Sequence, residues 1–587
     1  MEKWIVRTKR AEFDEIAKKF QIDPVTARII RNRDVVGDDQ IQKYLYGGWE
    51  DLYDPKQLHD GVEAAKLLSS LIQQKKRIRI IGDYDIDGVT SSYILRSGIE
   101  RCNGIADHVI PHRIVDGYGV NEQLITQAHE DGIEAIVTCD NGISAFDAIQ
   151  LAKEYGMTVI VTDHHEVPFV YKEDGSKEIL RTKADFIVNP KQAECSYPFK
   201  GLCGASVAFK FIQLLYLECG IPMDETREFL SYVAIGTVGD VMDLIDENRI
   251  LVKLGLEMIH QTQDVSLLAL IKQCKLKPEE MNVYSIGFVV GPCMNASGRL
   301  DTAEITLELL LTKREPQASI LAAKLVELNE ERKKMTEQNL NQAIEQIQMK
   351  GWDQDKVMVV FLPDCHESIA GIIAGRLRER YYRPVFVLTR GEEAIKGSGR
   401  SIEGYSMFEE MVKVSELFLK FGGHPLAAGC SLLEENVTTL REQLNQLCEL
   451  EEEDFVSKVY IDIPMPMDYV TTGLIDEFKL LEPLGNGNRA PIFAQKDVTV
   501  SKAMVIGKNQ NTIKLELITP NNNIVEGIFF KGVDRFFEYI TERYGVEEAR
   551  LVKSGNTKNV KLSFTFCPSI NEYNGKTTIQ MKILNYC

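Results

Sequence analysis

Four short runs rich in β-branched residues alternate with helical patterns between residues 77 and 240 of this 587-residue chain. The runs lie at 77–82, 134–139, 158–162 and 185–189, and a helical pattern at 144–155 separates two of them. Strands that are apolar on both faces and alternate with helices build parallel sheets covered on each side by helices. We therefore expect an α/β fold with a parallel sheet in this part of the chain.

The remainder of the chain is too long for one hydrophobic core, so further domains are expected. Residues 316–350 contain no Gly and no Pro after the first position, and are rich in Ala, Leu, Glu, Lys and Gln. This composition predicts one long helix, which is either a connector between domains or a surface helix within one domain. Strand patterns at 357–362 and 384–388 flank a helical pattern at 367–380, which indicates a second α/β region.

From about residue 456 the pattern changes to short strands separated by turn signals, which favours a small β-barrel of the OB type. The expected organisation is then an N-terminal segment, a catalytic domain, a connector helix, a second α/β domain and an OB-like β-barrel. Their predicted bounds are 1–50, 51–315, 316–350, 351–452 and 453–587.

Composition restricts the location and the partners of the protein. The formal net charge is −19, which argues against indiscriminate binding to nucleic acid but not against a local groove lined by Lys and Arg. No stretch approaches the ~20 apolar residues of a membrane span, and the start, Met1-Glu2-Lys3-Trp4, has no signal-peptide core. The twelve cysteines include no CxxC pair, so we expect reduced thiols in a cytoplasmic protein rather than disulfides or a zinc site.

Three acidic clusters each follow one of the predicted parallel strands. They are DYDIDG at 83–88, DNG at 140–142 and DHH at 163–165, and Asp240 ends a later apolar helical run. The carboxyl ends of parallel strands form the ligand-binding crevice of such a sheet, so these segments are expected to meet. Converging carboxylates repel one another, and divalent cations relieve the repulsion. Mixed carboxylate and imidazole ligands suit Mn²⁺, with Mg²⁺ suited to the oxygen-rich part.

Simpler interpretations of single clusters stay open. An EF-hand loop that began at Asp83 would need an acid at its twelfth position, where this chain has Ile94. Asp87 and Asp140 are each also compatible with a helix N-cap. Three clusters after three successive strands favour the metal site over these alternatives.

The four motifs resemble those of the DHH phosphoesterase superfamily, whose members hold two divalent cations, usually Mn²⁺ or Mg²⁺, and hydrolyse phosphoesters without a covalent nucleophile. The resemblance implies metal-ligand roles for Asp83, Asp85, Asp140, His164 and Asp240, with Asp140 as the bridging carboxylate. For Asp87 and His165 it leaves ligation, support of a ligand and contact with the scissile phosphate open. Many superfamily members have a histidine several residues before the first paired aspartate, whereas this region is Ile80-Ile81-Gly82 here. RecJ-like members use an aspartate instead of that histidine, so the departure favours a RecJ-like protein.

Further motifs resemble the RecJ family. The stretch PHRIVDGYG at 111–119 implies that Arg113 contacts a 5′-phosphate and that Tyr118 stacks on a base; without the resemblance, Tyr118 would be an ordinary aromatic beside a turn. The stretch NASGRL at 295–300 implies a phosphate contact by Arg299 with support from Asn295.

The second α/β region resembles the DHHA1 domain that accompanies many DHH domains. Its motifs are HES at 366–368, GSGRS at 397–401 and GGH at 422–424, and residues 481–488 resemble the start of a RecJ-type OB domain. The resemblance implies substrate contacts by His366, phosphate contacts by Ser398 and Arg400, and a contact of His424 with the nucleotide near the cut.

Together these resemblances imply a single-stranded-DNA exonuclease that releases 5′-mononucleotides in the 5′→3′ direction, in recombination and repair. They also imply a monomer that works with a single-strand-binding protein and a helicase. One alternative is a DHH phosphodiesterase acting on short oligoribonucleotides or cyclic dinucleotides. The other is a scaffold without a metal site, which the intact set of aspartates and histidines argues against.

Overall fold

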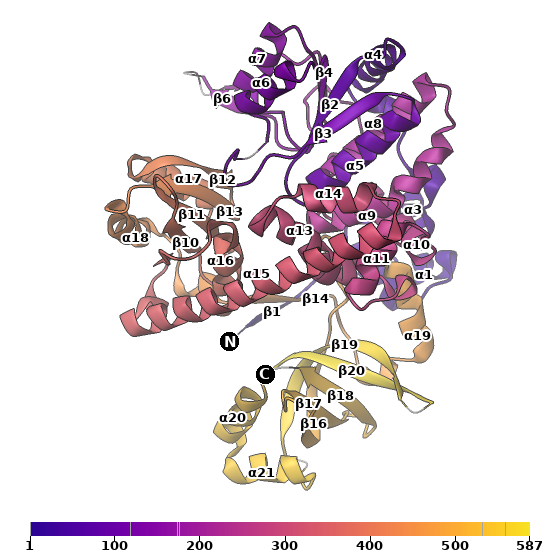
Figure 1. Ribbon diagram of the computed structural model, residues 1–587. Helices are drawn as coiled ribbons and strands as arrows, with labels where there is room; N and C mark the ends of the chain where they lie inside the picture. The colour runs from indigo at the N-terminus through magenta and orange to yellow at the C-terminus, as the bar shows by residue number, and fades with distance from the viewer. Residues whose placement is uncertain are drawn as a thin grey trace. The chain divides into compact units, whose positions relative to one another are not determined.

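The computed structural model describes residues 2–117, 119–172, 174, 176–530, 532–557, 559–573 and 575–587, so the predicted base contact of Tyr118 lies outside the described residues. The chain forms two compact units (Figure 1). The first unit comprises Tyr53–Met242 and Leu251–Ser457, and the second comprises Glu2–Leu52, Asp243–Ile250 and Lys458–Cys587. No helix within the described residues is long and apolar enough to cross a membrane.

The first part of the first unit is built on a five-stranded parallel sheet. Its strands, in spatial order, are β3 (Ile105–Val109), β2 (Arg77–Ile81), β4 (Ala135–Cys139), β5 (Thr158–Thr162) and β8 (Phe186–Val188). The four predicted runs are β2, β4, β5 and β8, so the expected parallel sheet is confirmed, and the edge strand β3 is added to it. The central strands are buried along nearly their whole length because helices cover both faces.

Helices of this part divide between the two faces of the sheet, as Figure 1 shows. α6 (Glu122–Glu130) and α7 (Phe146–Glu154) pack through Ile125 and Ile149 against β4 and β5. The other face carries α4 (Gly61–Gln73), α5 (Ile86–Arg101) and α8 (Gly204–Glu218). α5 and α8 contact each other closely. Gly98 of α5 permits this approach, because a β-carbon there would lie 2.6 Å from the side chain of Ile212 on α8.

An all-helical region follows the sheet and ends in the predicted long helix. Its elements include α9 (Leu230–Gly239), α10 (Asp246–His260), α11 (Val265–Gln273), α13 (Gly291–Leu300) and α14 (Glu304–Leu311). The predicted helix at 316–350 is α15 (Glu315–Lys350), one uninterrupted helix of 36 residues. Pro316 occupies its first turn, and Gly351 ends it in the left-handed conformation with φ 65°.

The second α/β region has a mixed sheet. Its strands, in spatial order, are β12 (Phe418–His424), β13 (Ala427–Leu432), β11 (Ile395–Arg400), β10 (Val385–Arg390) and β9 (Met358–Phe361). Only β9 and β10 are parallel; the other neighbours are antiparallel. α16 (Glu367–Tyr381) and part of α15 cover one face, and α17 (Met407–Lys413) and α18 (Asn436–Leu447) cover the other.

The second unit contains a six-stranded mixed sheet formed by the C-terminal residues. Its strands, in spatial order, are β15 (Ile463–Pro464), β16 (Phe493–Ile506), β17 (Thr512–Ile518), β18 (Ile524–Phe530), β20 (Lys576–Tyr586) and β19 (Lys561–Tyr573). The last strand in this order, β19, also pairs with β16. α20 (Val533–Tyr544) and α21 (Val546–Ser554) precede β19.

The N-terminal residues belong to this same unit, an association that no pattern in the sequence indicated. β1 (Lys3–Val6) pairs in parallel with β14 (Lys458–Ile461). The following helices are α1 (Phe13–Phe20), α2 (Pro24–Asn32) and α3 (Asp38–Tyr46). Ile29 and Ile30 of α2 lie in one hydrophobic core with Phe493 and Phe566 of the sheet.

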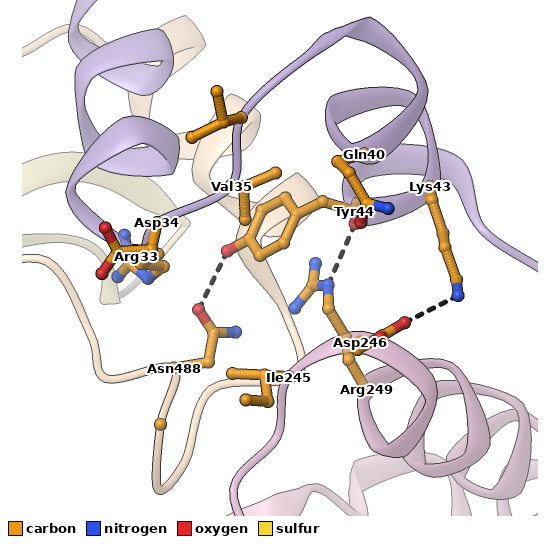
Figure 2. Close-up of a pocket in the computed structure, with 12 residues that line it drawn as sticks. Arg33, Asp34, Val35, Gln40, Lys43, Tyr44, Ile245, Asp246, Arg249 and Asn488 are labelled. Atoms are coloured by element: carbon orange, nitrogen blue, oxygen red, sulfur yellow. Dashed lines mark hydrogen bonds and ion pairs between the residues drawn. The ribbon is translucent and has the colours of Figure 1, made fainter. Parts of the chain in front are cut away.

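The buried side chain of Arg249 ties three segments of the second unit together. Its Nε donates to the carbonyl oxygen of Tyr44 at 2.9 Å, and its Nη1 and Nη2 donate to those of Leu481 and Leu480 at 2.7 Å each. The guanidinium also lies 4.0 Å from the centre of the Tyr44 ring. Figure 2 shows this arrangement at a pocket of about 300 Å³, where the Tyr44 hydroxyl donates to Asn488 Oδ1 at 2.9 Å.

We predict that Arg249→Met lowers the free energy of unfolding of the second unit by about 3 kcal/mol or more. Each carbonyl left without a donor costs roughly 1–3 kcal/mol. The carbonyls of Tyr44 and Leu480 lose their Arg249 donor, whereas that of Leu481 keeps Asn488 Nδ2 as a donor. The measurement is urea-dependent hydrogen exchange of peptides from 2–52 and 458–587. Lys479→Ala, which removes an ion pair whose lysine is 71% exposed, is the matched control and should leave stability nearly unchanged. Equal effects of the two substitutions would contradict the role of Arg249.

Candidate metal centre

The acidic clusters meet at the carboxyl edge of the parallel sheet, as the strand order requires. Asp83 and Asp85 follow β2, Asp140 follows β4, and His164 follows β5. Asp240 arrives from the C-terminal end of α9, which packs against α5 and α8. The five predicted metal ligands therefore come from four separate segments of the first unit.

His164 lies at the centre of the cluster. Its Nε2 is 3.0 Å from Asp140 Oδ1, 3.7 Å from Asp87 Oδ2 and 3.8 Å from Asp240 Oδ2. Within the described residues, three overlapping groups offer one ligand atom from each member, all within 4.8 Å of one another. The groups are Asp83–Asp85–Asp140, Asp140–His164–His165 and Asp87–His164–Asp240. Asp140 belongs to two groups, which is the position that a bridging carboxylate requires.

Asp87 is fully buried and already has strong partners. Its Oδ2 accepts from Gly204 N at 2.6 Å and its Oδ1 from Ala205 N at 2.8 Å, at the start of α8. A carboxylate at a helix N-terminus is stabilised by the free N–H groups and by the helix dipole. This geometry favours a role for Asp87 in positioning His164 over direct ligation. Gly236 is required nearby, because a β-carbon there would approach Asp87 Oδ1 to 2.8 Å.

The backbone holds the other two strand-end aspartates in place. Asp85 is the N-cap of α5, and its Oδ1 accepts from Asp87 N and Gly88 N at 3.0 and 3.1 Å. The N-cap interpretation of Asp87 and Asp140 is wrong, because Asp85 is the N-cap of α5 and Ala145 is that of α7. Asp140 adopts the left-handed conformation with φ 60°, which is uncommon for a residue with a side chain and concentrates at functional sites.

Burial and mutual repulsion make this cluster electrostatically unfavourable on its own. Burial, and then neighbouring aspartates, raise the pKa of Asp83 and Asp140 well above the usual range, and raise that of Asp240 to about 8. Within the described residues, Asp83 Oδ1 and His164 Nδ1 are buried without a hydrogen-bond partner. A set of buried oxygen and imidazole donors in this condition fits divalent cations, whose charge opposes the repulsion.

The two histidines have different electrostatic environments. Burial lowers the pKa of His164, which keeps its ring neutral, and neutral imidazole is the form that binds metals. For His165, burial opposes protonation, but the hydrogen bond with Asp163 outweighs it and raises the pKa to about 9. Asp163 Oδ1 lies 2.8 Å from His165 Nδ1 and also accepts the backbone N–H groups of both histidines. Asp163 therefore orients the pair, a role the sequence did not assign to it.

α13 brings the NASGRL motif against the first acidic cluster. Asn295 Oδ1 accepts from Ile86 N at 2.8 Å, so this side chain supports the first turn of α5. Arg299 Nη1 donates to the carbonyl oxygen of Ser368 at 2.7 Å. His366 is the N-cap of α16, and its Nδ1 lies 2.7 Å from Ser368 Oγ, so the HES turn lies next to Arg299.

Arginines gather in this part of the first unit, despite the net charge of −19. Burial and the positive charges of Arg113 and Arg332 lower the pKa of Arg299 to about 10. Burial and the charges of Arg378 and Arg113 likewise lower the pKa of Arg400. Mutually repelling guanidinium groups are a physical signature of a site for anions. The sequence patterns indicated Arg113, Arg299 and Arg400 but not Arg332 or Arg378, which lie on ordinary helical stretches.

The strand register places Ser398, Arg400 and His424 on one face of the sheet of the second α/β region. Arg400 pairs with Ala427, and Ala427 pairs with His424, so Arg400 and His424 occupy one row two strands apart. Ser398 is two residues before Arg400 on β11 and therefore shares its face. A β-carbon at Gly371 of α16 would lie 3.0 Å from Arg400 Nη2 and 3.5 Å from Ser398 Oγ, so a glycine makes room for both.

Family models match three parts of the chain. The DHH family N-terminal domain matches residues 77–237, the DHHA1 domain matches residues 354–450, and the RecJ OB domain matches residues 461–585. The parallel sheet with its acidic edge, followed by the second α/β region, thus defines a protein of the DHH class.

Similar curated proteins and solved structures identify the family within the DHH class. The single-stranded-DNA-specific exonuclease RecJ of Bacillus subtilis is 33% identical over 99% of this chain and 70% of its own length. The proteins of that name from Haemophilus influenzae and Escherichia coli are 30% and 29% identical, over 98% and 99% of this chain and of their own lengths. The chain belongs to the RecJ family. The structure of Thermus thermophilus RecJ in complex with Mn²⁺ is 25% identical and covers all of this chain and 79% of that one, with a TM-score of 0.82.

We predict that Asp140→Asn stabilises the metal-free protein while it removes stabilisation by Mn²⁺. The substitution deletes one buried charge from a repelling cluster, and asparagine also tolerates the left-handed conformation. Because burial and neighbouring aspartates raise the pKa of Asp140, the loss of this carboxylate stabilises the metal-free protein at neutral pH. Thermal unfolding with chelator and with Mn²⁺ measures both effects.

Asp147→Asn, on the exposed first turn of α7, is the matched control. It should keep the stabilisation by Mn²⁺ seen in the wild type. A metal-free Asp140→Asn protein that is less stable than the wild type would contradict the predicted repulsion.

Proposed function

We propose that this chain is a metal-dependent exonuclease that degrades single-stranded DNA from the 5′ end to 5′-mononucleotides. The observation that carries the proposal is the carboxylate–histidine cluster in the same unit as an arginine cluster, in a chain of the RecJ family. The first cluster suits divalent cations, and the second suits phosphate groups. The relatives named above support single-stranded DNA as the substrate, and the solved RecJ structures with Mn²⁺ and with Mg²⁺ support either ion.

We assign the cation-binding role to Asp83, Asp85, Asp140, His164 and Asp240. When bound there, two cations supply an activated water and neutralise charge that develops on the phosphoryl group. Asp87 keeps His164 in position through its anchorage on α8. Asp163 holds His165 protonated at neutral pH, so His165 can donate a proton or a hydrogen bond to the phosphate or the leaving oxygen.

We assign the strand to the arginine-rich surface. Arg113 lies 4.7 Å from the Tyr84 ring centre, directly beside the first acidic cluster, which suits a contact with the 5′-phosphate. The phosphates that follow and the nucleotide near the cut are assigned to a second set of side chains. These are Asn295, Arg299, Ser398, Arg400, His424 and the HES turn at His366. Tyr118 keeps its predicted role of base stacking. The backbone and side-chain donors of these motifs give affinity without reading sequence.

The family resemblance also supports proposals about the location, the oligomeric state, the partners and the domain bounds of the protein. We propose that the chain acts as a cytoplasmic monomer in recombination and repair, with a helicase and a single-strand-binding protein as partners. We further propose that the chain divides in sequence order into 1–50, 51–315, 316–350, 351–452 and 453–587, with the first segment packing with the last in one compact unit. The family-model matches at 77–237, 354–450 and 461–585 support the three larger parts.

We predict that the wild type releases mononucleotides progressively from the 5′ end of a long single strand in Mn²⁺, and that Asp140→Asn lowers kcat at least about a thousandfold. Loss of cation binding removes several kcal/mol of charge stabilisation from the transition state. Strands labelled at the 5′ end, at the 3′ end and internally report the polarity. Asp147→Asn should retain full activity. Release from the 3′ end, or turnover of di- to tetranucleotides alone, would refute the proposed substrate and direction.

We also predict that Arg113→Gln lowers kcat/KM about tenfold or more on a 5′-phosphorylated strand, and much less on a strand with a 5′-hydroxyl. A charge-assisted contact with the terminal phosphate is lost only when that phosphate is present. Arg101→Gln, which removes an arginine 48% exposed and paired with Glu225, controls for loss of positive charge. If Arg113→Gln reduced both activities equally, the assignment to the 5′-phosphate would be wrong.

A further inference from the structure

One continuous helix leads from the surface of the first unit to the arginine cluster. It consists of α12 (Val283–Ser285), a π-helical stretch at Ile286–Val290 and α13 (Gly291–Leu300), with helical backbone angles at both junctions. π-Helical stretches inside α-helices are rare and occur frequently at functional sites. The α13 end carries Asn295 and Arg299, which the proposed function assigns to the substrate.

The exposed positions of this helix form a single stripe. Tyr284 and Phe288 are 66% and 70% exposed, and half-buried positions continue in line with them at Pro292, Asn295 and Arg299. Their spacings of four, four, three and four residues keep them on one side of a helix. The residues between Val290 and Arg299 on the other sides are mostly buried. A molecule held at Arg299 can therefore extend along the stripe to the two aromatic rings.

The aromatic pair is unusual because two large rings stack on each other in solvent. The ring centres of Tyr284 and Phe288 are 5.0 Å apart, and the ring planes are inclined by 25°. Their stacking fixes both rings in one orientation and leaves ring surface accessible at each residue. Exposed aromatic surface of this kind is used by proteins that bind single-stranded nucleic acid, because every base offers a face for stacking.

Glycines outside the stripe pack this helix against segments of the metal centre. A β-carbon at Gly287 would lie 3.5 Å from Val238, which is two residues before Asp240. A β-carbon at Gly291 would lie 3.3 Å from Ile86, whose backbone N–H is held by Asn295. The π-helical stretch is thus packed against the two segments that deliver Asp85 and Asp240 to the cluster.

We propose that Tyr284 and Phe288 form a stacking platform for bases of the single-stranded substrate, several nucleotides from the end that is cut. This inference rests on the proposed function. At about 1.5 Å per residue the platform lies roughly 20 Å along the helix from Arg299. A stacked strand advances at least about 3.4 Å per nucleotide, so the platform meets the strand at most about six nucleotides away.

Nucleic acid fits the platform better than a protein partner does. Two aromatic side chains bury about 150–250 Å² each, well below the ~800 Å² per partner of a stable protein interface. The stripe is continuous with positively charged Arg299, which suits a chain that alternates bases with phosphates. A base-stacking platform also fits an enzyme that has to accept any sequence.

The test compares substrates that do and do not reach the platform. The variant Tyr284→Leu/Phe288→Leu keeps apolar side chains and removes both rings, and Tyr284→Phe/Phe288→Tyr keeps both rings. Tyr155→Leu removes another exposed ring, which stacks on His129 at 4.2 Å in the same unit, and is the matched control. Each protein is assayed for kcat/KM on a dinucleotide and on a strand of about 30 nucleotides.

The double leucine variant should lower the ratio of long-strand to dinucleotide kcat/KM about tenfold or more, the effect of losing one or two stacked bases. The ring-exchange variant and Tyr155→Leu should keep the wild-type ratio. In metal-free protein, 2-aminopurine placed within about six nucleotides of the 5′ end should be quenched by the wild type and not by the leucine variant.

An unchanged ratio and unchanged quenching in the leucine variant would overturn the platform. So would an equal loss on both substrates, which indicates a structural role. A wild type that cleaves no single strand would overturn the proposed function, and the platform with it; that failure is recognisable because every variant would share it.

Discussion

The structure of the first unit depends on one constraint, which is the repulsion among aspartates gathered in a buried space. The parallel sheet delivers Asp83, Asp85 and Asp140 to one edge, and the C-terminal end of α9 adds Asp240. The surrounding elements stabilise these carboxylates with backbone N–H groups and leave space for them. The first N–H groups of α8 bind Asp87, three N–H groups bind Asp163, and glycines at 204 and 236 leave room for the carboxylates. Such an arrangement is costly without cations and stable with them, so metal binding and the local fold are coupled.

The same unit also carries a cluster of positively charged arginines. Arg299, Arg332 and Arg400 each have their pKa lowered by burial and by neighbouring cations, although the whole chain is strongly acidic. A net charge is therefore a weak guide to the substrate, because a few buried guanidinium groups dominate the local potential. The contact between Arg299 and the carbonyl of Ser368 joins the helical region to the second α/β region. The proposed phosphate contacts and the proposed metal ligands thereby lie in different parts of one compact unit.

The sequence was sufficient to predict the parts that depend on local patterns. Runs of β-branched residues predicted β2, β4, β5 and β8. Because ligand sites form at the carboxyl ends of parallel strands, the sequence also predicted that Asp83, Asp140 and His164 lie close together. It could not predict what depends on packing between distant segments. The edge strand β3 is only partly buried and lacks a continuous apolar pattern, and β1 is too short to be recognised before it pairs with β14. Arg332 and Arg378 lie in helices whose charged faces look like ordinary solvent-exposed surface, and Asp163 shows its role only through its hydrogen bonds. The exposed stripe from Tyr284 to Arg299 requires knowledge of which residues are buried.

The most direct test of this account is the stoichiometry of Mn²⁺ binding, measured by electron paramagnetic resonance on metal-stripped wild type and Asp140→Asn. The account predicts two Mn²⁺ ions per wild-type chain with magnetic coupling between them, because Asp140 belongs to two of the three groups of possible ligands. It predicts that the coupled signal is lost in Asp140→Asn. A wild type that binds no Mn²⁺, or that binds isolated ions unaffected by Asp140→Asn, would contradict the claim that this buried carboxylate cluster is a two-cation centre.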